Sequence, residues 1–576
     1  MKRIHYLQFF LLILTVFALS CARQTSPTGG PKDSIPPTVV RTIPEDQQIN
    51  FQGQQIEATF SESVQLNNPK EQLIITPGVG KDFQASVKKN KVVVKLTKPL
   101  SPNTTYTISF REAVQDITEK NPAQNLHLAF STGTYIDSLH LFGRVYEVLT
   151  AKEGKDATVG LYEQDTFNIF RHKPSYFTKA DATGIFHLDN LKPGSYRVYA
   201  WLDNNKNLLV DSKSEAYGFL PETVRPQDST YALEIPLVKL DARPLRITSA
   251  RPSQTFFNIK TSKSTDYFSV TTQGTELYAA YGEDHENIRI YNTMTLQAED
   301  SIPIAFIARD SLLQSIDTTL YLKFAQRTIK PQPFQMAGEQ FSISGASGLM
   351  YGLLSFNKPV MNINYDSIYY RIDTTQIVKI LPQDVHLDSM RTRLTITKQL
   401  DKSLLQPKPP VKSNTQQPKT TTPPTPRAEP RTSKTKPVQK KNPNNNELTI
   451  ADGTFISAEG DSSKAMAAAI KPTTIETTGV IILEIKTQQR PLLVQLLSKG
   501  NVVSQQAAKT KTIFPDLQPG EYTLRVIVDT DQNLRWSPGN IFQNHPPEPI
   551  YFYMNEEGKP SITLKANWER ELLITF

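Results

Sequence analysis

LKPGSYRVYAWLDNNKN, residues 191–207, and LQPGEYTLRVIVDTDQN, residues 517–533, match in spacing without a gap. Each stretch combines a Pro-Gly turn, an alternating apolar run and a closing cluster of Asp and Asn. Alternation with a period of two predicts a half-buried β-strand, and the Pro-Gly and Asp/Asn clusters predict the turns at its ends. The chain therefore contains a duplicated β unit, and this repeat guides the interpretation of the remaining sequence.

Short apolar runs of the same kind recur along the 576 residues, as in KVVVKLT at 91–97, TYTISF at 105–110, RLTITK at 393–398 and GVIILEI at 479–485. They are rich in β-branched and aromatic residues, and turn residues separate them, which is typical of short strands in sandwiches or barrels. The best helix candidate is the short, Ala-rich stretch 462–470. The length suggests roughly three to five domains. The predicted fold is all-β, with β-sandwich domains in tandem.

Residues 37–135 carry an ordered series of motifs. Phe60 precedes a short acidic turn, an L-x-P-N-T-x-Y corner ends at Tyr106, V-x-D-x-x-x-x-N begins at Val114, and F-S-T-G closes the series at 130–133. The Pro-Asn corner can turn the chain between sheets, and the aromatic side chains can bury large apolar areas. The series resembles the bacterial Ig-like domains of surface and periplasmic proteins. This resemblance implies a β-sandwich and says almost nothing about a ligand.

The duplicated unit spans residues 137–240 and 477–576. In the first copy, T-G-x-F is followed by L-x-P-G-x-Y-x-V, with Gly184 and Pro193 at the turns and Phe186 among the inward-facing residues. The pattern resembles the carboxypeptidase-regulatory or transthyretin-like β-sandwich. That module is non-catalytic wherever the pattern occurs, so the resemblance implies no reaction.

The duplication extends upstream of the second copy. LLSFNKPVMNI at 353–363 resembles ATFSESVQL in the first Ig-like segment, and RTRLTITKQL at 391–400 resembles KVVVKLTKPL. Residues 338–475 are therefore predicted to form a second Ig-like domain, and residues 244–335 a further β domain without an assigned family. We number the five segments, 37–135, 137–240, 244–335, 338–475 and 477–576, as domains 1 to 5.

The net charge of +8 belongs to one segment. Residues 406–446 hold nine lysines and arginines, one acid (Glu429), ten prolines and no aromatic residue. This composition cannot bury enough surface to fold, which predicts a disordered Pro/Lys/Thr-rich insertion in a loop of domain 4 or, alternatively, a plain linker. The segment could be a solvated spacer or could contact an anionic surface. Without aromatic residues it is not expected to bind nucleic acid.

An apolar run at 6–19 follows a short basic start and precedes Cys21, the single cysteine. The run is short for a membrane span and has the flanks of a cleaved signal. The segment resembles a bacterial lipobox, although Ala18 stands where Leu is usual. The resemblance implies a signal peptide at 1–20 and a membrane anchor through diacylglycerol and palmitate-like acyl chains on Cys21, with a polar tether over 21–36. The alternative is an ordinary signal peptide with a stray cysteine.

Both copies of the repeat end in an Asp/Asn loop that could bind a cation. Oxygen ligands at positions one, three and five suit calcium, and both loops depart from an EF-hand, with Leu208 or Leu534 at the glycine position and Ser214 or Asn540 at the final Glu position. The alternative is an Asx-rich turn that satisfies its own backbone. The candidate ligands are Asp203, Asn205, Asn207 and Asp211 in the first loop, and Asp529, Asp531 and Asn533 in the second.

No catalytic motif stands out, and we expect no enzyme. The eight histidines lack metal-ligand spacing, and no G-x-S-x-G, H-E-x-x-H or S-x-x-K motif lies in a fitting context. With its thiol acylated, the cysteine would offer no nucleophile. Trp536, Phe542 and Trp568 could line a sugar-binding face, or they could be core and turn residues.

The chain as a whole resembles the Ig-like-domain lipoproteins of Bacteroidetes-type bacteria. This resemblance implies export to the cell envelope, a lipid anchor in the outer membrane and no cofactor, with calcium as the one candidate. We expect a non-enzymatic scaffold that binds a protein or cell-wall partner through strand edges and loops. The alternative is a surface-displayed carbohydrate-binding or calcium-dependent adhesive module. Because no acidic run follows Cys21, the periplasmic face is favoured over the cell surface.

Overall fold

The computed structural model describes residues 33–576 except 124–125, 164–166, 227–231, 254, 274, 293–300, 325–331, 374, 406–445 and 475. The described chain is almost entirely β-structure, which confirms the predicted all-β fold. Cys21, the signal peptide and residues 406–445 lie outside the described residues, so lipidation and disorder stay predictions. Within the described part of the chain, no helix is both long and apolar enough to cross a membrane.

Domain 1 is a sandwich with sheets β1-β2-β6-β5 and β4-β7-β9 and a small pair β3-β8. Phe60 and Phe130 are fully buried, and the ring of Tyr106 stacks on that of Phe130 with 5.8 Å between centroids. The Tyr106 hydroxyl accepts the Ser101 N–H at 2.9 Å, which fixes the predicted corner. The elements are β1 (Val39–Ile43), β2 (Gln55–Phe60), β3 (Val64–Leu66), α2 (Pro69–Gln72), β4 (Ile74–Thr76), β5 (Phe83–Lys88), β6 (Lys91–Leu96), β7 (Thr105–Ser109), β8 (Val114–Asp116) and β9 (His127–Ser131).

Domain 4 repeats this strand order. Its sheets contain β25-β26-β31-β30, β28-β32-β34 and β27-β33 in the same arrangement, with β29 and β35 added. Residues 406–445 join β31 to β32, the loop in which the sequence predicts an insertion. The elements are β25 (Met336–Ser344), β26 (Leu349–Phe356), β27 (Val360–Ile363), η1 (Tyr365–Ser367), β28 (Ile368–Arg371), β29 (Ile377–Lys379), η2 (Pro382–Asp384), β30 (Val385–Leu387), β31 (Arg393–Gln399), η3 (Lys402–Leu404), β32 (Glu447–Ile450), β33 (Phe455–Ser457), β34 (Met466–Ala469) and β35 (Pro472–Thr473).

Two expectations for this part of the chain are wrong. Residues 462–470 form no helix, because Met466–Ala469 is strand β34 and pairs antiparallel with β32. The helix propensity of a few alanines is too weak to hold so short a helix, and pairing with a neighbouring strand outweighs it. The core of domain 4 also begins earlier than predicted, since Phe334 is buried in it and Met336 packs against it.

Domains 2 and 5 share a second topology. Domain 2 has sheets β13-β10-β16 and β12-β11-β14-β15, and domain 5 has β39-β36-β43 and β38-β37-β40-β41 with β42 beside β40. In both, the last strand pairs in parallel with the first. The equivalent residues Tyr196 and Tyr522 donate their hydroxyls to the carbonyls of Lys192 and Gln518 at 2.7 and 2.6 Å. The repeat therefore extends to side-chain detail.

The strands of domain 2 are β10 (Leu139–Glu147), β11 (Thr158–Tyr162), β12 (Tyr176–Lys179), β13 (Ile185–Leu191), β14 (Arg197–Trp201), β15 (Tyr217–Phe219) and β16 (Leu233–Leu237). Those of domain 5 are β36 (Gly479–Lys486), β37 (Leu492–Ser498), β38 (Asn501–Ala507), β39 (Lys511–Leu517), β40 (Gly520–Val528), β41 (Ile550–Phe552), β42 (Ile562–Leu564) and β43 (Glu569–Thr575), with the short helix η4 (Ile541–Gln543). Domain 3 packs sheet β17-β18-β22-β21 on sheet β20-β19-β23-β24. Its strands are β17 (Ile247–Ser253), β18 (Phe256–Thr261), β19 (Tyr267–Thr272), β20 (Thr275–Glu276), β21 (Ala279–Tyr281), β22 (Asn287–Tyr291), β23 (Ile302–Arg309) and β24 (Ser315–Leu322).

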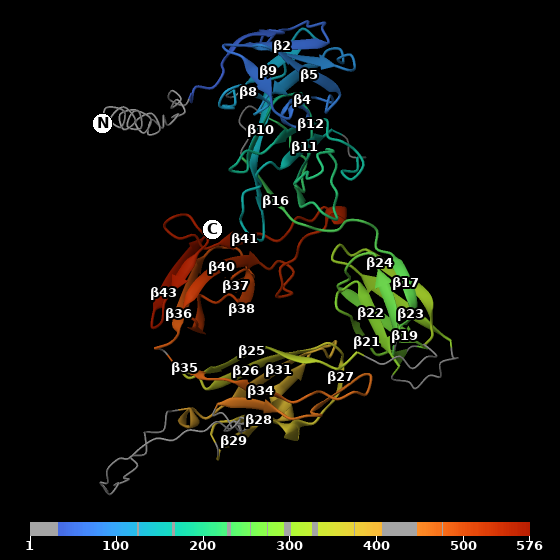
Figure 1. The fold of residues 1–576 in the computed structure, drawn as a ribbon, viewed down its shortest axis with the longest axis vertical. Helices are drawn as coiled ribbons and strands as arrows, with labels where there is room; N and C mark the ends of the chain where they lie inside the picture. The colour runs from blue at the N-terminus through green and yellow to red at the C-terminus, as the bar shows by residue number, and fades with distance from the viewer. Residues whose placement is uncertain are drawn as a thin grey trace, which may run out of the picture.

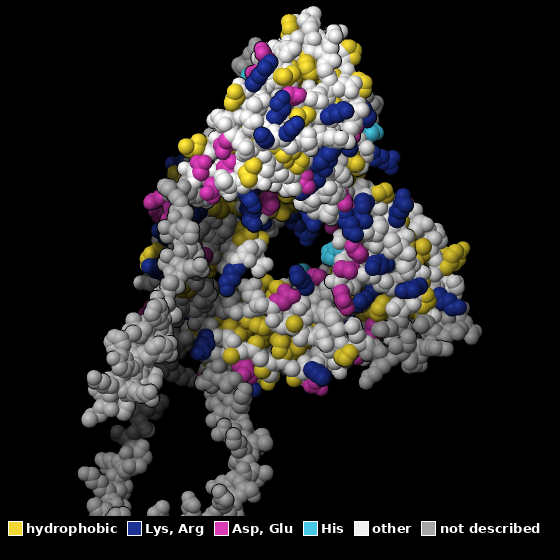
Figure 2. Space-filling view, turned by 45° about the horizontal axis from the view of Figure 1, so that its top comes forward, with side chains coloured by type: hydrophobic (Ala, Val, Ile, Leu, Met, Phe, Trp, Pro, Cys, Tyr) yellow, Lys and Arg dark blue, Asp and Glu magenta, His cyan; other side chains and the backbone are white. Residues whose placement is uncertain are grey.

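Domains 2 to 5 form a closed ring, and domain 1 projects from domain 2 (Figure 1). Figure 2 shows an open hole at the centre of this ring. Apolar clusters join domain 2 to domain 3 and domain 3 to domain 4. Ser344 donates to the carboxylate of Asp516 and so joins domain 4 to domain 5. Arg525 Nη1 donates to the Leu149 carbonyl at 2.9 Å, which joins domain 5 to domain 2 and closes the ring.

Domain 1 meets domain 2 through apolar and charged contacts. Ile74 packs with Phe177 and Leu208 in a buried cluster, and Arg111 pairs with Asp156 at 3.0 Å. Leu208 belongs to the first Asp/Asn loop, which therefore also takes part in holding the two domains together.

Candidate functional site

The first Asp/Asn loop joins β14 to β15 and is bound together by its own side chains. Asp203 accepts the N–H groups of Asn207 and Leu208 at 3.0 and 3.1 Å, and Asn205 also accepts that of Asn207 at 3.1 Å. Asn207 and Asp211 each accept the backbone N–H two residues further on. The four predicted residues thus lie in one loop, and each uses an oxygen to satisfy the backbone.

The second loop joins β40 to β41 with the same geometry. Asp529 accepts the N–H groups of Asn533 and Leu534, both at 3.1 Å, and Asp531 accepts that of Asn533 at 3.2 Å. These contacts reproduce the first loop position by position. The two loops are therefore one structural element that occurs twice.

The leucine at the sixth position has the left-handed backbone that glycine provides in an EF-hand. The angle φ is 62° at Leu208 and 57° at Leu534, and this region is uncommon for residues other than glycine. At this position the loops therefore differ from the EF-hand in residue type, while they share its left-handed backbone angle φ.

A buried glutamate, absent from the predicted residues, completes each loop. Glu215 is fully buried and accepts the N–H groups of Asn204 and Asp211 at 2.9 and 2.8 Å. Burial raises the pKa of its carboxyl, although the hydrogen bonds from the backbone act in the opposite direction. A carboxylate that bridges two points of the loop in this way fixes the distance between them.

Glu548 has the same role in the second loop. It accepts the N–H groups of Thr530 and Ser537 at 2.6 and 2.9 Å, and these residues are the repeat equivalents of the two donors in the first loop. Glu215 follows Asp203 by 12 residues, and Glu548 follows Asp529 by 19. Neither glutamate stands at the twelfth position of its loop, where an EF-hand has its final Glu, so the EF-hand pattern does not identify them. The signal that does identify them is an acid just before the next strand.

Asp529, Asp531 and Glu548 form the oxygen cluster best suited to a cation. One carboxylate oxygen of each lies within 4.8 Å of the other two, and among the described acids this is the group close enough to share a metal. Asn533 does not add an oxygen, because its Oδ1 accepts the N–H of Arg535 and its Nδ2 donates to Asp531. Calcium would have to share these carboxylates with N–H donors that already occupy them.

The second loop is seven residues longer than the first, and the additional chain reaches from domain 5 to two other domains. Residues 538–547, which we call the clasp, stand where the first loop has only 212–214. Asn540 is buried and donates from Nδ2 to the carbonyl of Leu312 in domain 3 at 2.7 Å. Ile541 packs against the apolar cluster between domains 2 and 3. Asn544 donates to the carbonyl of Pro221 in domain 2, so the clasp touches two other domains.

The clasp meets a rigid turn of domain 3 between β23 and β24. Asp310 accepts the N–H groups of Leu312 and Gln314 at 3.0 and 2.8 Å and forms a buried ion pair with Lys263. Gln314 in turn accepts the N–H of Leu245 at 3.0 Å. Contacts within domain 3 therefore hold this turn in place independently of the clasp.

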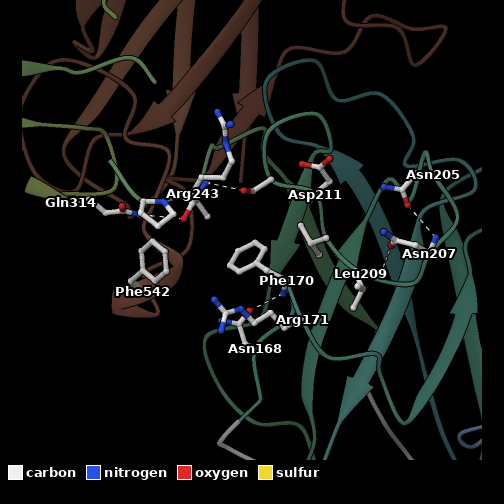
Figure 3. Close-up of a pocket in the computed structure, with 14 residues that line it drawn as sticks. Asn168, Phe170, Arg171, Asn205, Asn207, Leu209, Asp211, Arg243, Gln314 and Phe542 are labelled. Carbon is white, nitrogen blue, oxygen red and sulfur yellow. Dashed lines mark hydrogen bonds between the residues drawn. The ribbon is translucent and has the colours of Figure 1, made fainter. Parts of the chain in front are cut away.

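A groove of about 660 Å³ lies where domains 2, 3 and 5 meet (Figure 3). The first loop contributes Asn205 and Asp211, the loop between β11 and β12 contributes Phe170, the turn contributes Gln314, and the clasp contributes Phe542. Its volume is in the range of ligand sites in proteins. A second groove, of about 540 Å³, is lined by the same turn, the second loop and the clasp.

The three aromatic residues predicted as a sugar-binding face are not brought together. Trp536 donates its Nε1–H to the carbonyl of Glu548 at 3.0 Å and so supports the second loop. The ammonium group of Lys565 lies over the ring of Trp568, with its Nζ 4.7 Å from the ring centroid. Of the three, Phe542 alone lines the groove, and 55% of its surface is exposed.

Residues 33–132 match the model of the bacterial Ig-like domain, which confirms the Ig-like resemblance for domain 1. No curated protein matches the chain. Similar solved structures include the N-terminal part of a bacterial S-layer protein (14% identity, TM-score 0.14, covering 36% of this chain and 44% of that one). Others are a DUF3823 family protein from Bacteroides uniformis (10%, 0.12, 32% and 99%) and the major pilin subunit of Bacillus cereus (11%, 0.11, 76% and 99%). The chain thus spans less than half of the S-layer fragment.

Proposed function

We propose that the chain is a non-enzymatic lipoprotein of the cell envelope that serves as a multi-domain scaffold for a protein or cell-wall partner. The closed ring carries this proposal. Four sandwich domains are joined by buried clusters and by a clasp that reaches back across the ring. Such an assembly holds loops and strand edges of different domains at fixed positions, which is what a binding scaffold requires.

The domain composition supports the same function. Domains 2 and 5 are proposed to be carboxypeptidase-regulatory or transthyretin-like modules, and domain 4 a second Ig-like domain, because their strand orders repeat within the chain. The resemblance of domains 2 and 5 implies no reaction, which agrees with a non-enzymatic scaffold. A lipid on Cys21 would attach next to domain 1, which lies outside the ring (Figure 1). The grooves of the ring would then stay accessible.

The proposal is tested by isolating the tagged lipoprotein from detergent-solubilised envelopes after mild cross-linking. We expect one partner, protein or cell-wall polymer, in stoichiometric amount. A variant whose clasp is replaced by residues 212–214 serves as the control for a partner that needs the docked clasp. Recovery of no stoichiometric partner with the unaltered protein would refute the scaffold.

The anchor and its location are tested separately. We expect Cys21→Ser to abolish incorporation of labelled palmitate and to release the protein from the membrane fraction. We place the protein on the periplasmic face of the outer membrane. Protease treatment of intact cells should leave it uncut, and cleavage within 406–446 without lysis would place it on the cell surface instead.

A surface-displayed adhesive module that binds carbohydrate or depends on calcium is the second candidate. It is favoured by the groove at the junction of domains 2, 3 and 5 and by the oxygen cluster around Asp529. Intact-cell protease cleavage together with a calcium-dependent rise in melting temperature would support it over the periplasmic scaffold.

A further inference from the structure

We propose that the groove between domains 2, 3 and 5 is a glycan-binding site. The inference rests on the proposed function of envelope binding and assigns a ligand class to one site of the scaffold. Three features of the groove carry it: an apolar aromatic border, side-chain amides with oriented donors, and balanced charge.

The aromatic border comes from two domains. Figure 3 shows the rings of Phe170, in domain 2, and Phe542, in the clasp of domain 5, at the border of the groove. Phe170 packs edge-on against Tyr217 with 5.9 Å between centroids, so its position is fixed. Phe542 is 55% exposed. Aromatic rings offer a flat apolar face. The C–H face of a sugar ring is the apolar side of an otherwise hydrophilic ligand, and it can stack on such a face.

Three asparagine side chains line the groove, and each holds its amide in a defined orientation. Asn168, Asn205 and Asn207 each accept a backbone N–H, at 2.9, 3.1 and 2.6 Å, and only the amide oxygen can do so. Each Nδ2 therefore points away from that bond, and none of the three has a hydrogen-bond partner among the described residues. Donors held in this way match the hydroxyl and carbonyl oxygens of a saccharide.

The charges of the groove balance, which favours a neutral, hydroxyl-rich ligand over a phosphate or a charged peptide. Arg243 is paired with Asp241, with contacts of 2.9 and 3.1 Å from Nε to the two carboxylate oxygens. Arg171 and Asp211 remain as one cation and one anion at the groove. Asp211 uses Oδ1 for the N–H of Lys213, which leaves Oδ2 to accept hydrogen bonds from hydroxyl groups.

The site is composite, because no single domain supplies all of its parts. Domain 2 provides the amides and Phe170, the linker provides Arg243, and the clasp provides Phe542. The aromatic border on the domain 5 side exists only while the clasp is docked on domains 2 and 3. Glycan binding and docking of the clasp should therefore stabilise each other.

The test uses the protein from residue 22 to 576 and two soluble probes, muramidase-released peptidoglycan fragments and purified cell-surface polysaccharide, titrated by calorimetry. We expect binding of one probe, weakened at least tenfold by Phe542→Ala and by Asn168→Asp. The Asp side chain keeps the acceptor for the Phe170 N–H and removes the donor, so the loop should keep its structure. Which probe binds distinguishes cell-wall glycan from surface polysaccharide.

Two controls match these changes. Tyr321→Ala removes an aromatic ring that is 69% exposed on β24, and Asn555→Asp changes an amide that accepts backbone N–H groups outside the groove. Both should bind like the unaltered protein. Unaltered binding by Phe542→Ala and Asn168→Asp would overturn the site. No binding of either probe by the unaltered protein, together with recovery of a stoichiometric protein partner, would overturn the glycan inference and leave the scaffold standing.

Discussion

The side-chain amide of Asn540 in domain 5 donates a 2.7 Å hydrogen bond to the main-chain carbonyl of Leu312 in domain 3, and both residues are buried. The same side chain accepts the N–H groups of Phe542 and Gln543 at the start of η4. One residue thus orders the clasp and attaches it across the ring. A buried carbonyl that loses its donor costs about 1–3 kcal/mol.

We therefore expect Asn540→Ala to release the clasp from domain 3 and loosen the ring without unfolding a domain. The radius of gyration in small-angle X-ray scattering should rise, and amide exchange should accelerate in 310–314 and 538–547. Asn555→Ala is the matched control, because Asn555 caps a turn within domain 5 through the N–H groups of Glu557 and Lys559. Equal scattering curves for Asn540→Ala and the unaltered protein would show that this bond does not hold domain 5 against domain 3.

Replacing residues 538–547 by the Ser-Lys-Ser of 212–214 tests whether the only role of the insertion is to attach domain 5 to its neighbours. The core of domain 5 contains no clasp residue, so the variant should keep its β-structure by circular dichroism. Arg525 would still donate to the carbonyl of Leu149, so the ring should stay closed while the contact of domain 5 with domain 3 is lost. Loss of the domain 5 melting transition would instead assign the insertion to folding.

Gly539 has a left-handed backbone conformation in the clasp. Its φ is +77°, and a Cβ there would lie 2.5 Å from the carbonyl carbon of Pro546. Gly539→Ala should destabilise the docking of the clasp on domain 3 through strain and this clash. Gly453→Ala is the control, because its φ is +74° but nothing lies within 4 Å of the added Cβ. Amide exchange in the clasp should rise for the first variant alone, and equal effects of the two would rule out the clash.

The strands and the repeat could be predicted from sequence because both are local patterns. An alternating run such as KVVVKLT becomes β6, and the match between 191–207 and 517–533 becomes the equivalence of β14 with β40. A short stretch with weak local preference could not be predicted. Within residues 462–470, strand β34 forms by pairing with β32. A local sequence pattern carries no information about that pairing.

The ring and the buried glutamates have no local signature. Asn540 and Leu312 are separated by 228 residues, and a loop residue that bonds a carbonyl looks in sequence like any other Asn. Glu548 could not be predicted from spacing, because the clasp shifts it seven positions relative to its equivalent Glu215 in the first loop. Insertions change spacing while they preserve structure, so motif spacing fails at the site where the two copies differ.

Lys358 is a buried cation between two acids in domain 4. Its Nζ lies 2.7 Å from Glu459 and 2.8 Å from Asp461, and its side chain is 3% exposed. Lys358→Met leaves two facing carboxylates, one of them buried, without a cation and should cost roughly 3–5 kcal/mol. Lys379→Met is the control, because the ion pair of Lys379 with Asp366 is exposed and should be worth about 0–1 kcal/mol.

The pH dependence of this variant has a definite sign. Burial raises the pKa of Asp461, but hydrogen bonds from Lys358 and Ser457 outweigh burial, and the pKa falls below its ordinary 3.8. The contribution of Asp461 is therefore present above pH 3.8 and is lost as the pH falls through the lowered value. Without Lys358 the carboxyls gain from protonation, so the melting temperatures of variant and parent should converge in acid. A constant difference would contradict the pairing.

Calcium should leave the melting temperature of the protein unchanged. The oxygens of Asp529, Asp531 and Glu548 already accept backbone N–H groups, so the second loop is complete without an ion. A ligand that binds only the folded state raises its melting temperature, which makes titration with calcium or a chelator a direct measurement. Asp531→Asn keeps the acceptor for the Asn533 N–H and removes a charge. A calcium-dependent rise that this variant abolishes, and that Asp211→Asn retains, would assign an ion to the second loop and overturn the prediction.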